Sequence, residues 1–195
     1  MQITDGLSHN TARVDGSNRL QTFSINENVN DFSAKGGDSY NLATGLIALT
    51  GTAESSVLYL ENTGTKDIVY TSIVMGVGAR SATITDDAVF TIIRNPTGGD
   101  IVSNATALAG GNVNMNHGSS NTLDCLVYQG VDGGTITGGN DFGPFYVGTS
   151  SRVGVALTGR IPTGSSLGIK VDLNTSGGAN VYAAINCHLH DDTQV

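Results

Sequence analysis

Hydrophobic and polar residues alternate along most of the chain from Leu20 onward. Because successive side chains of a strand point to opposite faces, this alternation predicts half-buried β-strands. The clearest stretch is Leu167–Leu173, which we expect to be a central strand. The whole pattern predicts about eight to ten strands separated by turn residues. A strand is expected through Val89 to Ile93. The residues expected to share one face of a strand are Phe23 and Ile25; Tyr40 and Leu42; Ile47 and Leu49; Val69, Thr71, Ile73, Met75 and Val77; Leu123, Cys125 and Val127; Val153, Val155 and Leu157; Leu167, Ile169, Val171 and Leu173; and Val181, Ala183, Ile185, Cys187 and Leu189.

No window of the sequence has a convincing helical period, and the only helix-like piece, residues 103–111, is short. Many antiparallel strands without crossover helices predict an all-β fold, an antiparallel β-sandwich that is most simply a jelly roll. A barrel or an Ig-like sandwich is the alternative. Two Gly- and Asn-rich segments, residues 109–121 and 130–143, interrupt the pattern. Loops of this length are usually functional or ordered by a partner.

The first 19 residues contain little apolar material and cannot bury themselves. We therefore predict an extended N-terminal arm over residues 1–19 that docks on a neighbour or stays mobile. Residues 20–195 are expected to form a single β-sandwich domain, since a chain of 195 residues suits one domain with a sizeable core.

Charge narrows the possible partners. The net charge is −8, and only 9 residues are Lys or Arg, so no basic face is available to neutralise phosphates. We expect no nucleic-acid partner and, for the same reason, no anionic membrane. No apolar run approaches the roughly 20 residues of a membrane span, and the N-terminus lacks the pattern of a signal peptide. Synthesis in the cytoplasm is the expectation.

The end of the predicted last strand, AINCHLHDD, gathers the best candidates for a metal site. Strand alternation directs Cys187 into the core and His188 and His190 to the opposite, polar face, so thiol and imidazoles cannot share one ion. The two histidines form an H-x-H pair that needs a third ligand, such as Asp192, His117 or a residue of a symmetry mate. We favour a solvated or interface strand end over a metal site.

Other candidate chemistry is weaker, and we expect neither an enzyme nor a cofactor. The sequence has no G-x-S-x-G nucleophile motif, and the adjacent pairs Asp86-Asp87 and Asp191-Asp192 point apart on a strand. Calcium binding through Asp132 and Asp141 lacks the D-x-D-x-D-G pattern. Cys125 and Cys187 lie in apolar, strand-like contexts and are expected to be buried free thiols.

Several stretches resemble small virion structural proteins of tailed bacteriophages. The opening TDGLSHNTARVDGSNRLQTFSI is similar to an N-terminal segment of these proteins, in which Asp-Gly, a short polar stretch and an ARVD-S-NRL-like run precede the first strand. SSVLYLENTGTKDIVYTSIVMGVG and FTIIRNPTGGDIVSNATAL are similar too, RNPTGG being the most distinctive part. The resemblance covers roughly residues 4–110. The matching residues of the opening are Ala12, Arg13, Val14, Asp15, Asn18, Arg19 and Leu20.

The resemblance implies a non-enzymatic virion protein, made in the host cytoplasm and carried on the particle. The expected role is a capsid decoration or cement subunit, a homo-oligomer (trimer favoured) that binds the major capsid protein or another virion protein. Its arm, with Ala12, Arg13, Val14, Asp15, Asn18 and Arg19, would grip the shell. A head or tail appendage or fibre module that binds a host receptor or glycan through segments 109–121 and 130–143 is the alternative. A metal-dependent enzyme using His188, His190 and a carboxylate is the weakest hypothesis.

Overall fold

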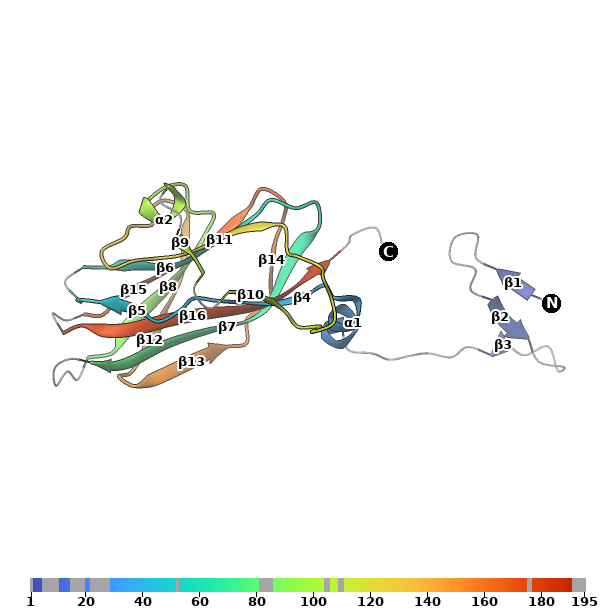
Figure 1. The fold of residues 1–195 in the computed structure, drawn as a ribbon, viewed down its shortest axis with the longest axis horizontal. Coiled ribbons are helices and arrows are strands. Elements are labelled where there is room, and N and C mark those ends of the chain that lie inside the picture. Colours follow the sequence, from blue (N-terminus) through green and yellow to red (C-terminus); the bar gives the residue numbers. More distant parts are fainter. Residues whose placement is uncertain are drawn as a thin grey trace.

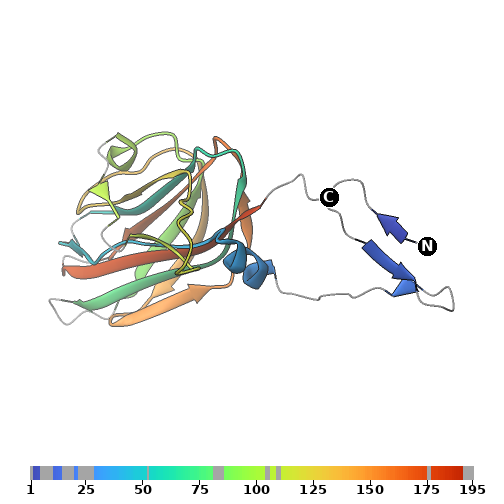
Figure 2. The same cartoon turned by 45° about the vertical axis from the view of Figure 1, so that its right-hand side comes forward.

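The computed structural model consists mainly of two antiparallel β-sheets that stack face to face around a hydrophobic core (Figure 1, Figure 2). This β-sandwich confirms the predicted all-β class. The structure describes residues 2–4, 11–14, 20–21, 29–51, 53–80, 86–103, 106–108, 111–174 and 177–190, with side chains from Ser33 onward.

The larger sheet has seven strands, and all of its pairs are antiparallel. Its main path runs in the order β10, β4, β16, β7, β13, while β5 also pairs with β16 and β14 with β7. Their bounds are β4 Ser39–Ala43, β5 Ile47–Leu49, β7 Asp67–Arg80, β10 Asn112–Asn114, β13 Ser151–Val155, β14 Gly159–Ile161 and β16 Ala179–His190.

The smaller sheet has six strands in the order β12, β8, β15, β6, β11, β9, again all antiparallel. The Leu167–Leu173 stretch supplies β15, which pairs with a strand on either side, so the prediction of a central strand is confirmed. The bounds are β6 Ser55–Asn62, β8 Ala88–Arg94, β9 Thr106–Ala107, β11 Cys125–Gln129, β12 Asn140–Val147 and β15 Ser166–Asp172.

Two helices and three short strands complete the described elements. Helix α1 (Val29–Gly36) packs on β4 and β16, and helix α2 (Asp100–Ser103) packs on β6 and β11. Strands β1 (Gln2–Thr4), β2 (Thr11–Val14) and β3 (Leu20–Gln21) pair with one another in antiparallel fashion. Strands β1 and β2 fall within the predicted arm, residues 1–19, and β3 follows it directly.

The core lies between the sheets and is made by the inward faces that alternation predicted. Tyr40 and Leu42, the Leu167–Leu173 set and the face from Val181 to Cys187 are all buried. Val153, Val155 and Leu157 are half-buried against this core. Phe23 and Ile25 lie outside the described residues.

One predicted face was wrong. In β7, Ile73, Met75 and Val77 are buried as expected, but the pairing with β16 shifts by one residue between Asn186 and Cys187. A register shift of one residue exchanges the two faces of a strand. Ile68 is therefore fully buried, whereas Val69, which the uninterrupted pattern places inward, is only half-buried.

Several further elements differ from the sequence prediction, helix α2 among them. Helix α1 was not foreseen, and residues 106–107 of the helix-like piece form strand β9 instead. Strand β10 lies within segment 109–121, where a loop was expected. Strand β12 was missed because most of its side chains are exposed and Gly143-Pro144 interrupts it, so it has no alternating pattern.

Candidate functional site

The outer face of the smaller sheet carries an apolar row that the chain itself covers. Ile93, Gly168 and Tyr59 lie opposite one another on β8, β15 and β6, and Tyr128 of β11 follows. The rings of Tyr59 and Tyr128 stack with their centroids 6.1 Å apart. Ile136 lies directly on Gly168, and Ile101 of α2 joins the same buried cluster. Part of segment 130–143 is therefore ordered by this second small core.

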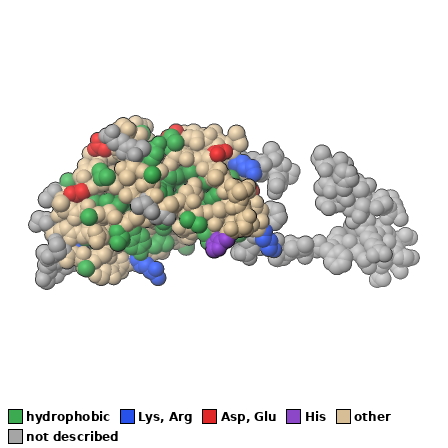
Figure 3. All heavy atoms as spheres, viewed as in Figure 1, with side chains coloured by type: hydrophobic (Ala, Val, Ile, Leu, Met, Phe, Trp, Pro, Cys, Tyr) green, Lys and Arg blue, Asp and Glu red, His purple; other side chains and the backbone are tan. Residues whose placement is uncertain are grey.

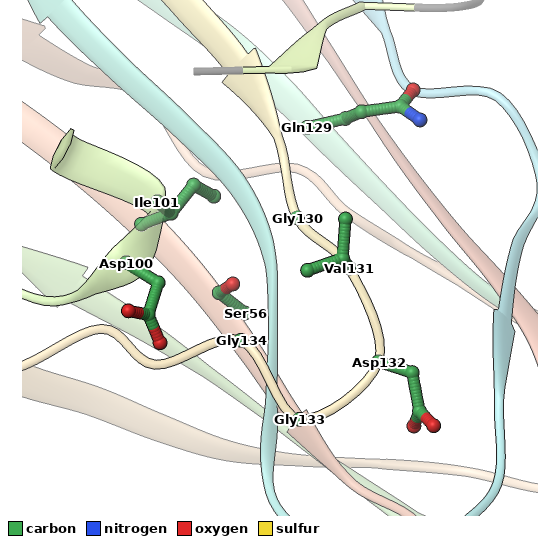
Figure 4. Close-up of a pocket in the computed structure, with 9 residues that line it drawn as sticks. All are labelled: Ser56, Asp100, Ile101, Gln129, Gly130, Val131, Asp132, Gly133 and Gly134. Atoms are coloured by element: carbon green, nitrogen blue, oxygen red, sulfur yellow. The ribbon is translucent and has the colours of Figure 1, made fainter. Parts of the chain in front are cut away.

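A pocket of about 240 Å³ lies at the edge of this cover, between α2 and the turn at residues 130–134 (Figure 4). Gly130 crosses β6 so closely that a Cβ atom there would collide with the Ser56 carbonyl oxygen. Ser56 lines the pocket, and its hydroxyl is buried without a hydrogen-bond partner among the described residues. A bound water or a small hydroxylated molecule would satisfy it.

The two carboxylates beside this pocket are already engaged with the protein. Asp100 Oδ2 accepts hydrogen bonds from the backbone N–H and the hydroxyl of Thr135 at 3.1 and 2.9 Å. Asp132 points away from Ser56 and accepts hydrogen bonds from the backbone N–H and the hydroxyl of Thr50 at 2.9 and 2.8 Å (Figure 4). Asp141 instead pairs with Lys170 at 3.6 Å. The structure thus does not bring Asp132 and Asp141 together as calcium ligands.

The outer face of the larger sheet carries a polar row in the corresponding place. The Asn41 amide nitrogen donates to Asn186 Oδ1 at 2.7 Å, and the Asn186 amide nitrogen donates to the Ser72 hydroxyl at 2.8 Å. This chain links β4, β16 and β7 across the sheet. These side chains satisfy one another, so the row needs no cover.

Beside the polar row, the same face carries small and uncharged side chains on β4, β16 and β7, and Arg152 of β13, which lies opposite Gly76, marks its edge. Ala43, Ala184, Val74 and Gly154 lie opposite one another on β4, β16, β7 and β13, and the Tyr182 ring lies across Gly76 in the next row. Figure 3 shows one side of the sandwich, where charged side chains are few and scattered. We call the set Asn41, Ala43, Ser72, Val74, Gly76, Gly154, Tyr182, Ala184 and Asn186 the uncharged face.

The predicted histidine pair lies at one end of this sheet, and its surroundings differ from the prediction. Cys187 points into the core as expected. His188 lies on the opposite face, but it is buried, with 5% of its surface exposed, instead of solvated. Helix α1, which no sequence pattern indicated, packs on this end of β16. Burial lowers the pKa of His188, and the neighbouring His190 lowers it further.

These histidines gather no metal-binding group in the part of the chain that the structure describes. Within those ranges, no three His, Cys, Asp or Glu side chains lie close enough together to hold a metal ion. Asp192, one suggested third ligand, lies outside the described residues. Within the described ranges, His188 Nδ1 is buried and has no hydrogen-bond partner.

Both cysteines are free thiols, as predicted; Cys187 is also buried as expected, whereas Cys125 is only half-buried. Burial raises the pKa of both Cys125 and Cys187 to about 12, so both stay protonated at neutral pH. A protonated, buried thiol is a poor nucleophile and a poor metal ligand.

The predicted arm residues are only partly placed. Ala12, Arg13 and Val14 belong to β2, which pairs with β1 and β3, but their side chains are not described. Asp15, Asn18 and Arg19 lie outside the described residues.

The described part of the chain contains no helix long and apolar enough to cross a membrane.

Comparison with protein families, curated proteins and solved structures found no match to this chain.

Sequence reasoning missed a groove at one end of the sandwich, lined by Tyr70 and Arg94. The signal was present for Arg94: it continues the inward-facing series Ala88, Phe90, Ile92 on one strand, where a charge is unexpected.

Proposed function

We propose that the protein is a non-enzymatic structural subunit of a tailed-phage virion, a capsid decoration or cement protein with a jelly-roll body that self-associates, with a trimer favoured. The observation that carries this proposal is the order of the strands. Jelly rolls recur in viral capsid and lectin domains.

Eight of the strands are taken in chain order: β4, β6, β7, β8, β12, β13, β15 and β16. The short strands β5 and β14 pair with β16 and β7 off the main path of the larger sheet. Numbered one to eight, they lie in the order 1-8-3-6 in the larger sheet and 2-7-4-5 in the smaller one. This alternation between sheets is the order expected of a jelly roll built from two Greek keys. On this proposal, β9, β10 and β11 are additions to one edge of the sandwich.

The uncharged face supports self-association. The chain carries a net charge of −8, so two copies repel each other wherever acidic residues meet. The uncharged face offers Ala43, Val74 and Ala184 for close packing and has no Asp or Glu among its residues. Interfaces are depleted in charge at their centres, so this surface suits contact with a second copy.

Sedimentation velocity tests the self-association. The wild-type protein should sediment with a multiple of the 20.0 kDa chain mass, and Ala184→Arg should shift it to a single chain by placing a charge in the middle of the face. Leu126→Arg is the matched control, because Leu126 is exposed on the other sheet and its substitution should leave the mass unchanged. A wild-type protein that remains a single chain at high concentration overturns the proposed oligomer.

Binding to virus particles tests the role itself. Purified protein should bind particles that lack it, and removal of residues 2–19 should weaken this binding if the arm grips the shell. Truncated protein that binds as well as the full chain contradicts the arm, and full-length protein that binds host cells but no particles contradicts the decoration role.

A further inference from the structure

The groove at the end of the sandwich consists of two adjoining hollows of about 290 and 190 Å³. Both are lined by Tyr70 of β7 and Arg94 of β8, and Phe142 of β12 lines the larger one. The groove therefore lies where the two sheets open, beyond the last buried core residues. We call it the Arg94 groove.

Arg94 is a cation on the inward-facing side of a strand. Ala88, Phe90 and Ile92 precede it on that side and are buried, while Arg94 itself is exposed where the sandwich ends. Among the described residues it has no carboxylate partner. Arg160 also lines the groove, but it lies opposite Val69 on the outer side of β14 and pairs with Asp67 at 3.2 Å. The free positive charge of the groove is therefore that of Arg94.

Tyr70 contributes a hydroxyl close to this charge. Its ring lies across Gly159, where any side chain would collide with the hydroxyl. Burial raises the pKa of Tyr70 while the Arg94 charge pulls it in the other direction, so the phenol stays protonated and can donate a hydrogen bond. Within the described part of the chain the hydroxyl has no partner.

Two further groups extend the set of contacts. Asn95 Oδ1 accepts the backbone N–H of Ser166 at 3.0 Å, which leaves the amide nitrogen of Asn95 as a donor in the smaller hollow. Phe142 is 44% exposed at the rim, so an apolar ring face is available to a ligand. A guanidinium fork, a phenol, an amide donor and an aromatic face are complementary to a carboxylate carried on a hydroxylated ring.

We propose that the Arg94 groove binds a carboxylated saccharide, with Arg94 receiving the carboxylate, Tyr70 and Asn95 donating to ring oxygens and Phe142 packing on the ring. The proposal concerns the isolated sandwich and is independent of self-association and of attachment to a particle. For the alternative role, an appendage that binds a glycan, the proposal names a specific ligand class. It also places the site largely outside segments 109–121 and 130–143, which were suspected first.

Titration of glucuronate into ¹⁵N-labelled protein, followed by NMR, tests this proposal. Glucuronate should shift amide signals around Arg94 with a dissociation constant in the millimolar range, as expected for about 4 kcal/mol of binding free energy. Glucose, which lacks the carboxylate, should bind at least tenfold more weakly. Equal binding of the two sugars, or no binding of glucuronate, overturns the proposal. Inorganic phosphate that shifts the same signals while glucuronate does not also overturns it, in favour of a phosphate site.

Variants separate the charge from the shape of the groove. Arg94→Gln should weaken glucuronate at least tenfold, and Arg94→Lys should restore only part of the loss because an ammonium lacks the bidentate fork. Arg152→Gln is the matched control, since Arg152 is exposed on β13 at the edge of the larger sheet. Unchanged glucuronate binding by Arg94→Gln, with an unchanged melting temperature, contradicts the assignment.

Discussion

Each outer face of the sandwich carries a middle row of side chains, but the two rows differ in polarity and in whether the chain covers them. On the smaller sheet the row is apolar, and it is covered by Ile101 of α2 and Ile136 of segment 130–143. On the larger sheet the row is Asn41, Asn186 and Ser72, whose side chains bond to one another. An apolar row must be removed from water, whereas a self-bonded polar row is stable in it.

This difference explains why segment 130–143 packs on the smaller sheet. Segment 130–143 was expected to be a partner-ordered loop, yet Ile136 packs on Gly168 and orders part of it without a partner. Among the described elements, α1 packs on one end of the larger sheet, and no other helix packs on its outer face. If a partner binds a face of this sandwich, the uncharged face is the one still available.

The largest effect should come from the core beneath both faces. Ile169 is fully buried on β15, so Ile169→Ala should lower the free energy of unfolding by about 2–5 kcal/mol through lost burial and a residual cavity. Chemical denaturation measures it. Val74→Ala on the uncharged face is the control and should cost less than about 1 kcal/mol, because Val74 is only half-buried. A cost below about 1 kcal/mol for Ile169→Ala means that β15 does not pack as described.

A smaller effect distinguishes the two faces by the same substitution. Gly130→Ala places a methyl group against the Ser56 carbonyl, which is fixed in β6, and should destabilise by about 1–3 kcal/mol. Gly76→Ala meets the Tyr182 ring, which can rotate away, so we expect a loss below about 1 kcal/mol.

Gly154→Ala is the control for this pair, since nothing lies within 4 Å of the added carbon. It should be neutral or slightly stabilising, by up to about 1 kcal/mol, because alanine reduces the entropy of the unfolded chain. Thermal and denaturant unfolding of the three variants measures the order. Equal losses for Gly130→Ala and Gly76→Ala contradict the idea that only one face is covered tightly.

Alternation along the chain was sufficient to predict the β-sandwich and most of the core, because burial on one face leaves a period of two in the sequence. It failed where that condition fails. The register shift in β7 exchanges faces without changing residue types, so Ile68 and Val69 were assigned to the wrong sides. Strand β12 is an exposed edge interrupted by Gly143-Pro144, so its residues show no alternating pattern.

The candidate sites were harder to predict, because they depend on contacts between distant segments. The outward direction of His188 follows from local alternation, but its burial depends on α1, about 150 residues earlier in the chain. The Arg94 groove combines residues from β7, β8 and β12 that no motif joins. Pairing between strands determines such sites, and pairing is not readable from one sequence.

The smallest expected effect concerns the end of the larger sheet on which α1 packs, at His188. Its pKa is lowered by burial and by His190, so the folded protein resists protonation of this ring more than the unfolded chain does. Stability from this group is fully present above the unfolded histidine pKa of about 6.5 and is lost as the pH falls below it. Wild-type protein should therefore lose stability between neutral pH and pH 5 more steeply than His188→Gln, whose side chain does not titrate. Urea unfolding at several pH values measures both slopes, and His117→Gln, at an exposed histidine, should keep the wild-type slope. Parallel curves for wild type and His188→Gln would show that α1 does not keep this ring from water.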